Sequence, residues 1–176
     1  GIRDDLVTGV QTCALPISFF LDAYAYVVES LVGKSIGRNN IHDLNDAVKK
    51  TSILAGYTAI ILAFGILLFG PFIISFLTDI TPVQEMARYS LAYASLYVFL
   101  AFPAFQLDGI FIGASLTRQM RDASFFSFTS FFTLCWVLTH FFGLNGLWVA
   151  FLMFVCARAL GLLYFYKDLR IKIAKR

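Results

Sequence analysis

The stretch FQLDGIFIGASLTRQMRD, residues 105–122, is an apolar run that holds one carboxylate, Asp108, and ends in basic residues. A charged side chain at the centre of a lipid bilayer costs about 3 kcal/mol by insertion scales. Such residues usually face a cavity or a partner, and they mark the path of an ion or a substrate. Both the fold and the candidate site therefore depend on whether this segment crosses a membrane.

The composition of the chain favours a membrane. Hydrophobic residues make up 59% of the sequence and charged residues only 14%, whereas ordinary soluble domains are roughly 45–50% apolar. A soluble domain of this size would have too little polar surface to cover its apolar runs. We therefore expect an all-α integral membrane protein with the lipid bilayer as its main partner. The net charge of +3 reflects basic loops, and we expect no nucleic-acid partner.

The first eighteen residues are expected to be foreign to the protein. VTGVQTCALPIS, residues 7–18, resembles the translation of a sequencing-library adapter; the alternative is a short native amphipathic segment. Under the adapter interpretation, residues 1–18 are non-native, Cys13 has no biological role, and residues 19–176 are the native part. The chain is then a fragment whose first helix is truncated near Phe19.

Five apolar segments follow the expected junction. They cover about residues 19–33, 52–77, 87–115, 123–142 and 144–166. A transmembrane helix needs about 20 residues, so the first segment is short, as truncation would make it. Pro103 interrupts the third segment, and a proline inside a membrane helix usually produces a kink. The loop of residues 37–50 predicts a separate interfacial helix with Asp43 or Asn45 as its N-cap.

The basic residues predict the orientation. Eleven Lys and Arg residues follow the first, third and fifth segments, whereas the alternate loops hold only Arg88. Loops rich in Lys and Arg stay on the cytoplasmic side. We therefore expect a multi-pass protein whose C-terminus is cytoplasmic.

Asp108 is expected near the middle of the membrane. Ten residues separate it from Arg118, which corresponds to about 15 Å of helix in a hydrocarbon core about 30 Å thick. Tyr93, Tyr97, Ala104 and Ser115 recur at helical spacings on the same face, which predicts a face turned toward a cavity. The expected substrate cavity is lined by Tyr26, Tyr93, Tyr97, Gln106 and Ser115. The alternative is an Asp108 that only hydrogen-bonds to a neighbouring helix.

The first segment carries two further acids. Asp22, Tyr26, Glu29 and Gly33 recur every three or four residues and share one helix face. Asp22 lies twelve residues from Lys34, about 18 Å along the helix, whereas Glu29 is close enough to the interface to snorkel or to pair with Lys34. Asp22 and Glu29 are therefore candidate ion-coupling residues beside Asp108.

Arg158 is the remaining charge inside an apolar segment. It predicts an ion pair with one of the acids or a contact to backbone carbonyls, and a role with substrate is the alternative. Gly109 and Gly113 form a GxxxG step, which predicts a close helix–helix approach.

The motifs of soluble enzymes, such as the phosphate-binding GxxxxGK[ST] loop and HExxH, are absent from the sequence. We expect no enzyme and no cofactor. A membrane-embedded enzyme that uses Asp22 and Asp108 stays open as an alternative.

Three stretches resemble the multidrug and toxic compound extrusion (MATE) transporters, in particular the DinF-like branch. FFLDAYAYVVESLVGKSIG (19–37), PAFQLDGIFIGASLTRQMRDA (103–123) and GLNGLWVAF (143–151) are similar to the eighth helix, the tenth helix and the start of the last helix. The resemblance extends from Phe19 to the C-terminus. It implies helices eight to twelve of a twelve-helix fold, and hence five helices of the six-helix C-terminal lobe. The N-terminal lobe and the seventh helix would be missing.

The resemblance also implies a function: export of organic cations and other drugs from bacteria across the inner membrane, by antiport with protons or sodium ions. A tenth-helix carboxylate contributes to the cation site of the family and matches Asp108, where sodium could bind. Asp22 and Glu29 match acids of the eighth helix, although Ala23 stands where a glycine often follows the aspartate. The fragment is expected to be inactive alone. A lipid-linked saccharide flippase of the same superfamily is the alternative, and several Arg residues in a cavity would favour it.

Overall fold

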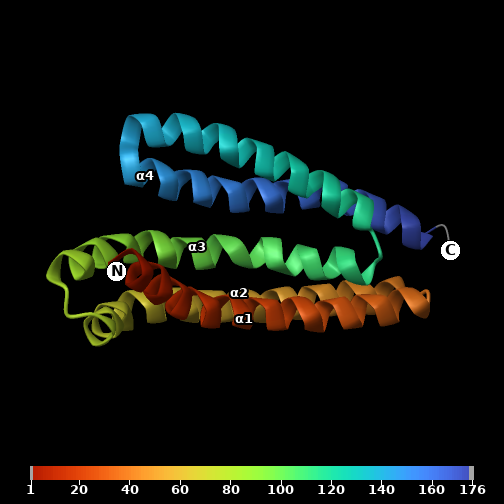
Figure 1. Ribbon diagram of the computed structural model, residues 1–176. Coiled ribbons are helices and arrows are strands. Elements are labelled where there is room, and N and C mark those ends of the chain that lie inside the picture. Colours follow the sequence, from red (N-terminus) through yellow and green to blue (C-terminus); the bar gives the residue numbers. More distant parts are fainter. Residues whose placement is uncertain (1, 175–176) are drawn as a thin grey trace.

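The computed structural model describes the backbone of residues 2–174 and the side chains of residues 19–167 and 169. These residues form the helices α1 (Ile2–Gly37), α2 (Ile41–Leu77), α3 (Thr81–Gly113) and α4 (Thr117–Ala174), and no strand occurs among them (Figure 1). α4 consists of two arms, residues 117–142 and 144–174, because the backbone of Gly143 (φ 56°, ψ −130°) is not helical. The five predicted apolar segments therefore correspond to α1, α2, α3 and the two arms of α4, and the predicted all-α fold is confirmed.

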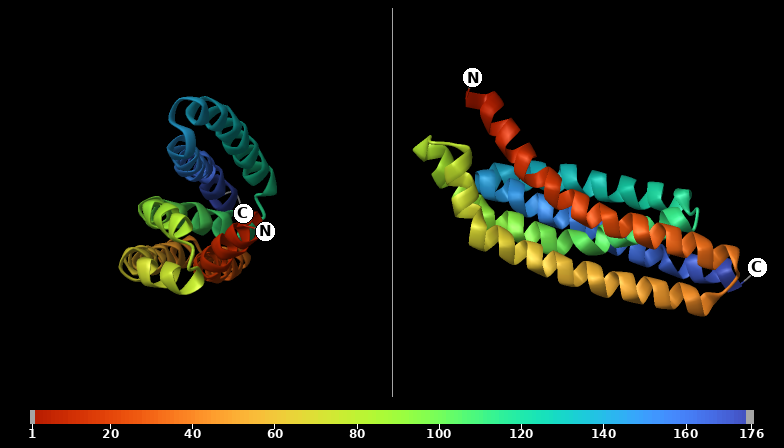
Figure 2. Two further views of the ribbon diagram at one scale, coloured as in Figure 1. Left: turned by 60° about the vertical axis from the view of Figure 1, so that its left-hand side comes forward. Right: turned by 90° about the horizontal axis from the view of Figure 1, so that it is seen from below.

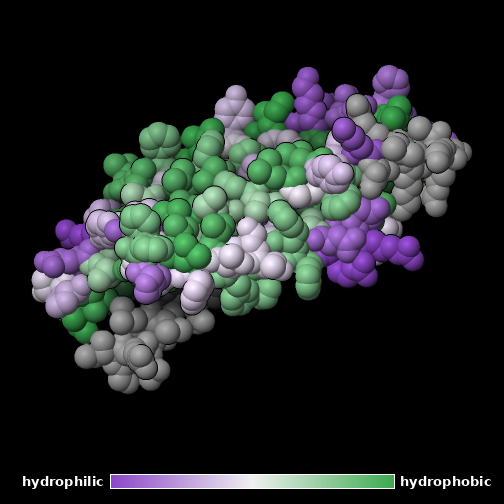
Figure 3. Space-filling view, turned by 90° about the horizontal axis from the view of Figure 1, so that it is seen from above, coloured by the Kyte–Doolittle hydropathy of each residue, from purple (hydrophilic) through white to green (hydrophobic). Residues whose placement is uncertain are grey.

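Three helices are long and apolar enough to cross a membrane: Ile41–Leu77, Thr81–Gly113 and Thr117–Lys167. The last includes the Gly143 turn, so each arm of α4 can cross separately. α1 is not among the three, and its described part carries the charged residues Asp22, Glu29 and Lys34. Apolar surface covers the middle of the face in Figure 3, with hydrophilic residues at both ends. This distribution is that of a multi-pass membrane protein.

The helices run antiparallel, and α4 folds back as a hairpin over α3 (Figures 1 and 2). The loops at residues 38–40 and 114–116 lie at the same end of the molecule as the C-terminal end of α4. The turn between α2 and α3 and the turn between the two arms of α4 lie at the opposite end. The three regions that carry most Lys and Arg are therefore at one end, as the positive-inside pattern requires.

Helix ends differ from the predicted ones in two places. Asn40 caps α2 by accepting hydrogen bonds from the backbone N–H groups of His42 (3.0 Å) and Asp43 (3.3 Å). A separate interfacial helix capped by Asp43 or Asn45 was therefore a wrong prediction, since no Gly or Pro between residues 41 and 55 separates it from the span. α3 ends at Gly113, and Ser115 lies in the following turn with φ 55°.

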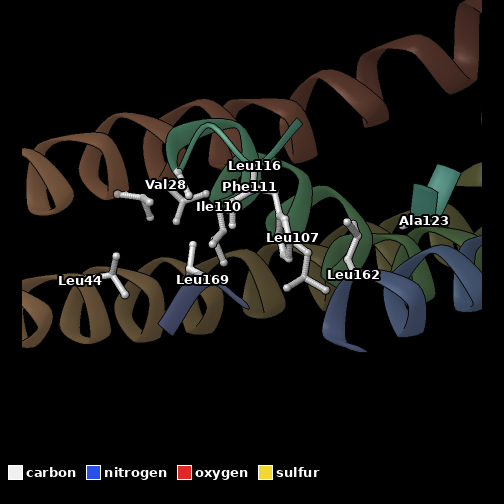
Figure 4. Packing of buried hydrophobic residues seen from close by; sticks show 11 residues of the cluster. Val28, Leu44, Leu107, Ile110, Phe111, Leu116, Ala123, Leu162 and Leu169 are labelled. Atoms are coloured by element: carbon white, nitrogen blue, oxygen red, sulfur yellow. The ribbon is translucent and has the colours of Figure 1, made fainter. Parts of the chain in front are cut away.

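α3 is the central helix of the core. Its residues Leu107, Ile110 and Phe111 pack with Val28 of α1 and Leu162 of α4, all of them buried (Figure 4). α3 also stays helical through Pro103, whose ring nitrogen cannot donate to the carbonyl of Phe99. The kink at Pro103 stays a prediction.

α1 approaches α3 at the two glycines of the GxxxG step. A Cβ on Gly109 would overlap the carbonyl oxygen of Ala25, and one on Gly113 would overlap that of Glu29. The backbones therefore meet without an intervening side chain, which confirms the predicted close approach. This contact places the Asp22 region of α1 beside the middle of α3.

Candidate cation site

Asp108 forms a two-pronged ion pair with Arg158 of the second arm of α4. Arg158 Nη2 donates to Asp108 Oδ1 at 2.8 Å, and Nε donates to Oδ2 at 3.1 Å. The side chain of Asp108 is 23% exposed and that of Arg158 is 22% exposed, so water or lipid reaches only part of each. Parallel charge-assisted hydrogen bonds of this kind are both strong and directional. The prediction that Arg158 pairs with one of the intramembrane acids is confirmed.

Ser124 holds the guanidinium from the other side. Arg158 Nη1 donates to Ser124 Oγ at 2.7 Å, and this hydroxyl donates to the carbonyl of Met120 at 2.7 Å. The group therefore joins α3 to both arms of α4. Ser124 was not among the predicted site residues, because it lies 34 residues from Arg158 and no sequence spacing connects the two.

Asp22 of α1 is the second carboxylate of the group. It follows Leu21, which packs in one buried cluster with Ala104 of α3 and Ala159 of α4, and within the described part of the chain its side chain makes no hydrogen bond or ion pair. Both oxygens of Asp108 accept from Arg158, and no described hydrogen bond joins the two acids. The carboxyl–carboxyl contact that a membrane-embedded enzyme would need is therefore not formed. Asp22 and Asp108 are the carboxylates that could hold a proton or a sodium ion.

Glu29 is separate from this group. Among the described side chains, the ion pairs are Lys50–Asp46, Arg121–Asp122 and Arg158–Asp108. The predicted pairing of Glu29 with Lys34 is therefore wrong, because residues five apart on a helix point roughly 140° away from each other. Its backbone carbonyl faces Gly113 instead. The role of Glu29 in ion coupling stays a prediction.

Two predicted cavity residues, Tyr93 and Tyr97, face the second arm of α4. The Tyr93 ring stacks on Trp148 (centroids 5.8 Å apart), and the Tyr97 ring stacks on Phe151 (4.7 Å). They follow the same side of α3 as Asp108, since all three contact the second arm. The structure therefore brings these three residues to one interface.

The other predicted cavity residues lie elsewhere. Gln106 is 3% exposed and donates through Nε2 to Thr51 Oγ1 of α2 at 2.7 Å, while its buried Oε1 has no hydrogen-bond partner among the described residues. Residues 106 and 108 point to nearly opposite sides of a helix, so Gln106 faces α2 and Asp108 faces α4. Tyr26 is 70% exposed on α1. Ser115 lies beyond the end of α3, so its predicted place on the Asp108 face is wrong.

The geometry can be compared with known proteins. A sequence profile described as MatE matches residues 7–137, which is more than half of the chain. The chain belongs to the MatE family. MatE proteins are membrane transporters. In this chain, Asp108 and Arg158 lie on helices that are long and apolar enough to cross a membrane.

Two relatives show how much of a MatE protein the chain represents. It is 30% identical over 149 residues to DNA damage-inducible protein F of Escherichia coli (strain K12), covering 82% of this chain and 31% of that protein. Its fold matches a solved structure described as the inward-facing conformation of a multidrug resistance MATE family transporter of the MOP superfamily. The TM-score is 0.73 and the identity 17%, and the match covers 98% of this chain and 38% of that one. The chain thus spans about a third of these relatives.

Proposed function

We propose that this MatE chain is part of a secondary active antiporter that exports organic cations in exchange for protons or sodium ions. The observation that carries the proposal is Asp108, a carboxylate inside a membrane helix whose only described ion-pair partner is Arg158. Asp22 adds a second acid on α1, which packs beside this part of α3. Intramembrane carboxylates that face a protein interior usually serve ion or substrate binding.

The mechanism is competition for the same negative charge. A proton or sodium ion at Asp108 or Asp22 reduces the attraction of the site for a cationic substrate, and the substrate in turn opposes ion binding. Such mutual opposition is a coupling free energy and is reciprocal between the two ligands. Alternating exposure of the site to the two sides of the membrane then links export to the ion gradient.

A complete transporter needs more than this chain. The chain spans 31% of its E. coli relative, and we infer that an N-terminal lobe and a seventh helix complete the site and that the fragment is inactive alone. We place the protein in the bacterial inner membrane with a cytoplasmic C-terminus. The asymmetric distribution of Lys and Arg supports this orientation.

A saccharide flippase is less well supported. A cavity that binds the phosphates of a lipid-linked saccharide would be lined by several cationic side chains. Between residues 123 and 166 the sequence holds one Arg and no Lys. That residue, Arg158, is already bound to Asp108 and Ser124.

The test is Asp108→Asn in the full-length transporter that carries this chain, reconstituted in lipid vesicles. We expect the loss of ion-driven efflux of a cationic dye, measured as dye release upon imposing a pH or sodium gradient. Asp46→Asn, an exposed acid in the first turns of α2, is the matched control and should retain efflux. Unchanged gradient-driven efflux in Asp108→Asn would contradict the proposal.

A further inference from the structure

We propose that Arg158 lowers the negative charge of the cation site by one and thereby favours ligands with one positive charge over ligands with two. This inference rests on the proposed antiport function and specifies its substrate class. Arg158 is then a specificity-determining residue, a built-in cation that offsets one of the two carboxylates. Its role follows from its contacts with Asp108 and Ser124; the sequence predicted an acid as partner but neither which acid nor the contact with Ser124.

Arg158 neutralises Asp108 as a permanently held counter-ion. Its Nε and Nη2 groups occupy both carboxylate oxygens, at 3.1 and 2.8 Å. The third nitrogen, Nη1, is held by Ser124 at 2.7 Å, so all guanidinium nitrogens have a partner. Arg is protonated at any physiological pH, and the positive charge therefore stays in the site whichever ligand is bound.

Asp22 supplies the charge that remains. Asp22 follows Leu21 of α1, which packs in one buried cluster with Ala104 of α3 and Ala159 of α4, so Asp22 lies near the Asp108–Arg158 pair. With both acids ionised, these two carboxylates and the one guanidinium carry one net negative charge. The apolar segment of α2, residues 52–77, contains no charged residue, so this helix cannot alter the balance.

A ligand with one positive charge balances the net negative charge of Asp22, Asp108 and Arg158. A monocation or a single proton neutralises the site, whereas a dication would leave one positive charge uncompensated in a medium of low dielectric constant. An uncompensated charge is costly in such a medium, so the ligand with two charges should bind more weakly. Replacing Arg158 with a neutral residue would raise the net negative charge to two and favour a dication.

The experiment uses two dyes with the same aromatic core: ethidium with one positive charge and propidium with two. Their affinities for the full-length transporter that carries this chain are measured in detergent by fluorescence polarisation. In the parent protein we expect ethidium to bind more tightly. In Arg158→Gln, the ratio of the ethidium affinity to the propidium affinity should fall about tenfold or more, which corresponds to 1.4 kcal/mol per factor of ten.

Two further variants separate charge from structure. Arg158→Lys keeps the charge but loses the two-pronged geometry, and it should keep the parent ratio. The double variant Asp108→Asn/Arg158→Gln removes one charge of each sign, so the net charge returns to one negative and the parent ratio should return. A purely structural role for Arg158 predicts that Arg158→Gln weakens the binding of both dyes equally and leaves their ratio unchanged. Elution as a single species in size-exclusion chromatography shows that each variant is folded.

A ratio that stays within twofold of the parent in Arg158→Gln, or that fails to recover in the double variant, would overturn the inference. That result leaves the proposed antiport intact provided that Asp108→Asn still abolishes gradient-driven efflux. If ethidium binding is insensitive to both Asp22→Asn and Asp108→Asn, the site itself is misplaced, and the proposed function and this inference fail together.

Discussion

At the scale of single residues, Asp108 and Arg158 depend on each other. Removing one member of a partly buried ion pair leaves the other without a partner, which usually costs more than the pair contributes. Removing both members avoids that penalty. Ser124 cannot substitute for Asp108, because a hydroxyl group offers no negative charge to the guanidinium.

We expect Arg158→Gln to lower the free energy of unfolding by about 2 kcal/mol, the range of hydrogen bonds to charged groups. The double variant Asp108→Asn/Arg158→Gln should lose less than the sum of the two single variants, with a coupling of about 1 kcal/mol. Thermal unfolding of the purified protein in detergent, followed by tryptophan fluorescence, measures these differences.

The control is Asp46→Asn, which removes the exposed pair of Asp46 with Lys50 (3.7 Å). Exposed pairs at this helical spacing contribute about 0.5 kcal/mol or less. Equal destabilisation by Asp46→Asn and Arg158→Gln would mean that the Asp108–Arg158 pair contributes no more to the free energy of unfolding than an exposed pair does.

The sequence predicted which residues carry the intramembrane charges, but only part of how they pair. A charge in an apolar membrane segment is rare and is usually paired or functional, which is why the sequence singles out Asp22, Asp108 and Arg158. Which acid Arg158 binds depends on the packing of α4 on α3, and this is set by contacts between residues 50 positions apart. The separation of Gln106 from Asp108 could have been inferred from the helical period, since residues two positions apart lie on nearly opposite faces of a helix.

At the scale of helices, the closest contact is that between α1 and α3. Gly109 and Gly113 leave no room for a side chain against the backbone of Ala25 and Glu29. Close packing of this kind replaces the hydrophobic effect as the force that associates helices in lipid. The position of Asp22 relative to Asp108 is therefore fixed by two glycines.

Gly109→Ala should separate α1 from α3 and lower the free energy of unfolding by about 2 kcal/mol, as overpacking does in well-packed cores. Gly65→Ala is the matched control, since a Cβ at Gly65 meets no atom within 4 Å and alanine favours the helix. Thermal unfolding in detergent compares the two. A Gly109→Ala protein as stable as Gly65→Ala would contradict the backbone contact.

The α4 hairpin depends on Gly143. Its φ of 56° with ψ of −130° lies in a region that residues with a side chain rarely adopt. We expect Gly143→Ala to lower the free energy of unfolding by about 2 kcal/mol through backbone strain, although its Cβ would meet no neighbour within 4 Å. Since Gly65→Ala also adds a methyl group in open space, equal stability of the two variants would exclude strain at the turn.

The apolar segments predicted the number of helices and the position of the α4 turn, because hydropathy determines what can enter a bilayer. The beginnings and ends of helices were harder to predict. Asp43, Asn45 and Asn40 are all residues that cap helices, and only the backbone geometry selects Asn40. Residues 1–18 were expected to be non-native, and this expectation stays a prediction; their side chains lie outside the described residues.

At the scale of the whole molecule, the basic regions gather at one end (Figure 1). The loops after α1 and α3 and the C-terminal end of α4 share this end, and the loop after α2 lies at the other. A membrane that crosses the apolar middle therefore separates a basic side from a side with few charges. The orientation of the protein in the cell can be tested from exposed loop residues on the two sides.

We expect His42→Cys to be cytoplasmic and Asp79→Cys to be periplasmic; both native residues are exposed. In the full-length transporter with its other cysteines replaced by Ser, an impermeant maleimide should label Asp79→Cys in cells with a permeabilised outer membrane. It should label His42→Cys only after the inner membrane is opened. The reverse pattern would invert the topology.

The placement of the ion pair has a mechanical consequence. α1 and α3 meet backbone to backbone, whereas α3 and the α4 hairpin meet through aromatic rings, buried aliphatic side chains such as Ile110 and Leu162, and one charged pair. A sliding of the hairpin by one helical turn, about 5.4 Å, would break both bonds between Arg158 and Asp108. The ion pair therefore opposes a movement of the hairpin along α3.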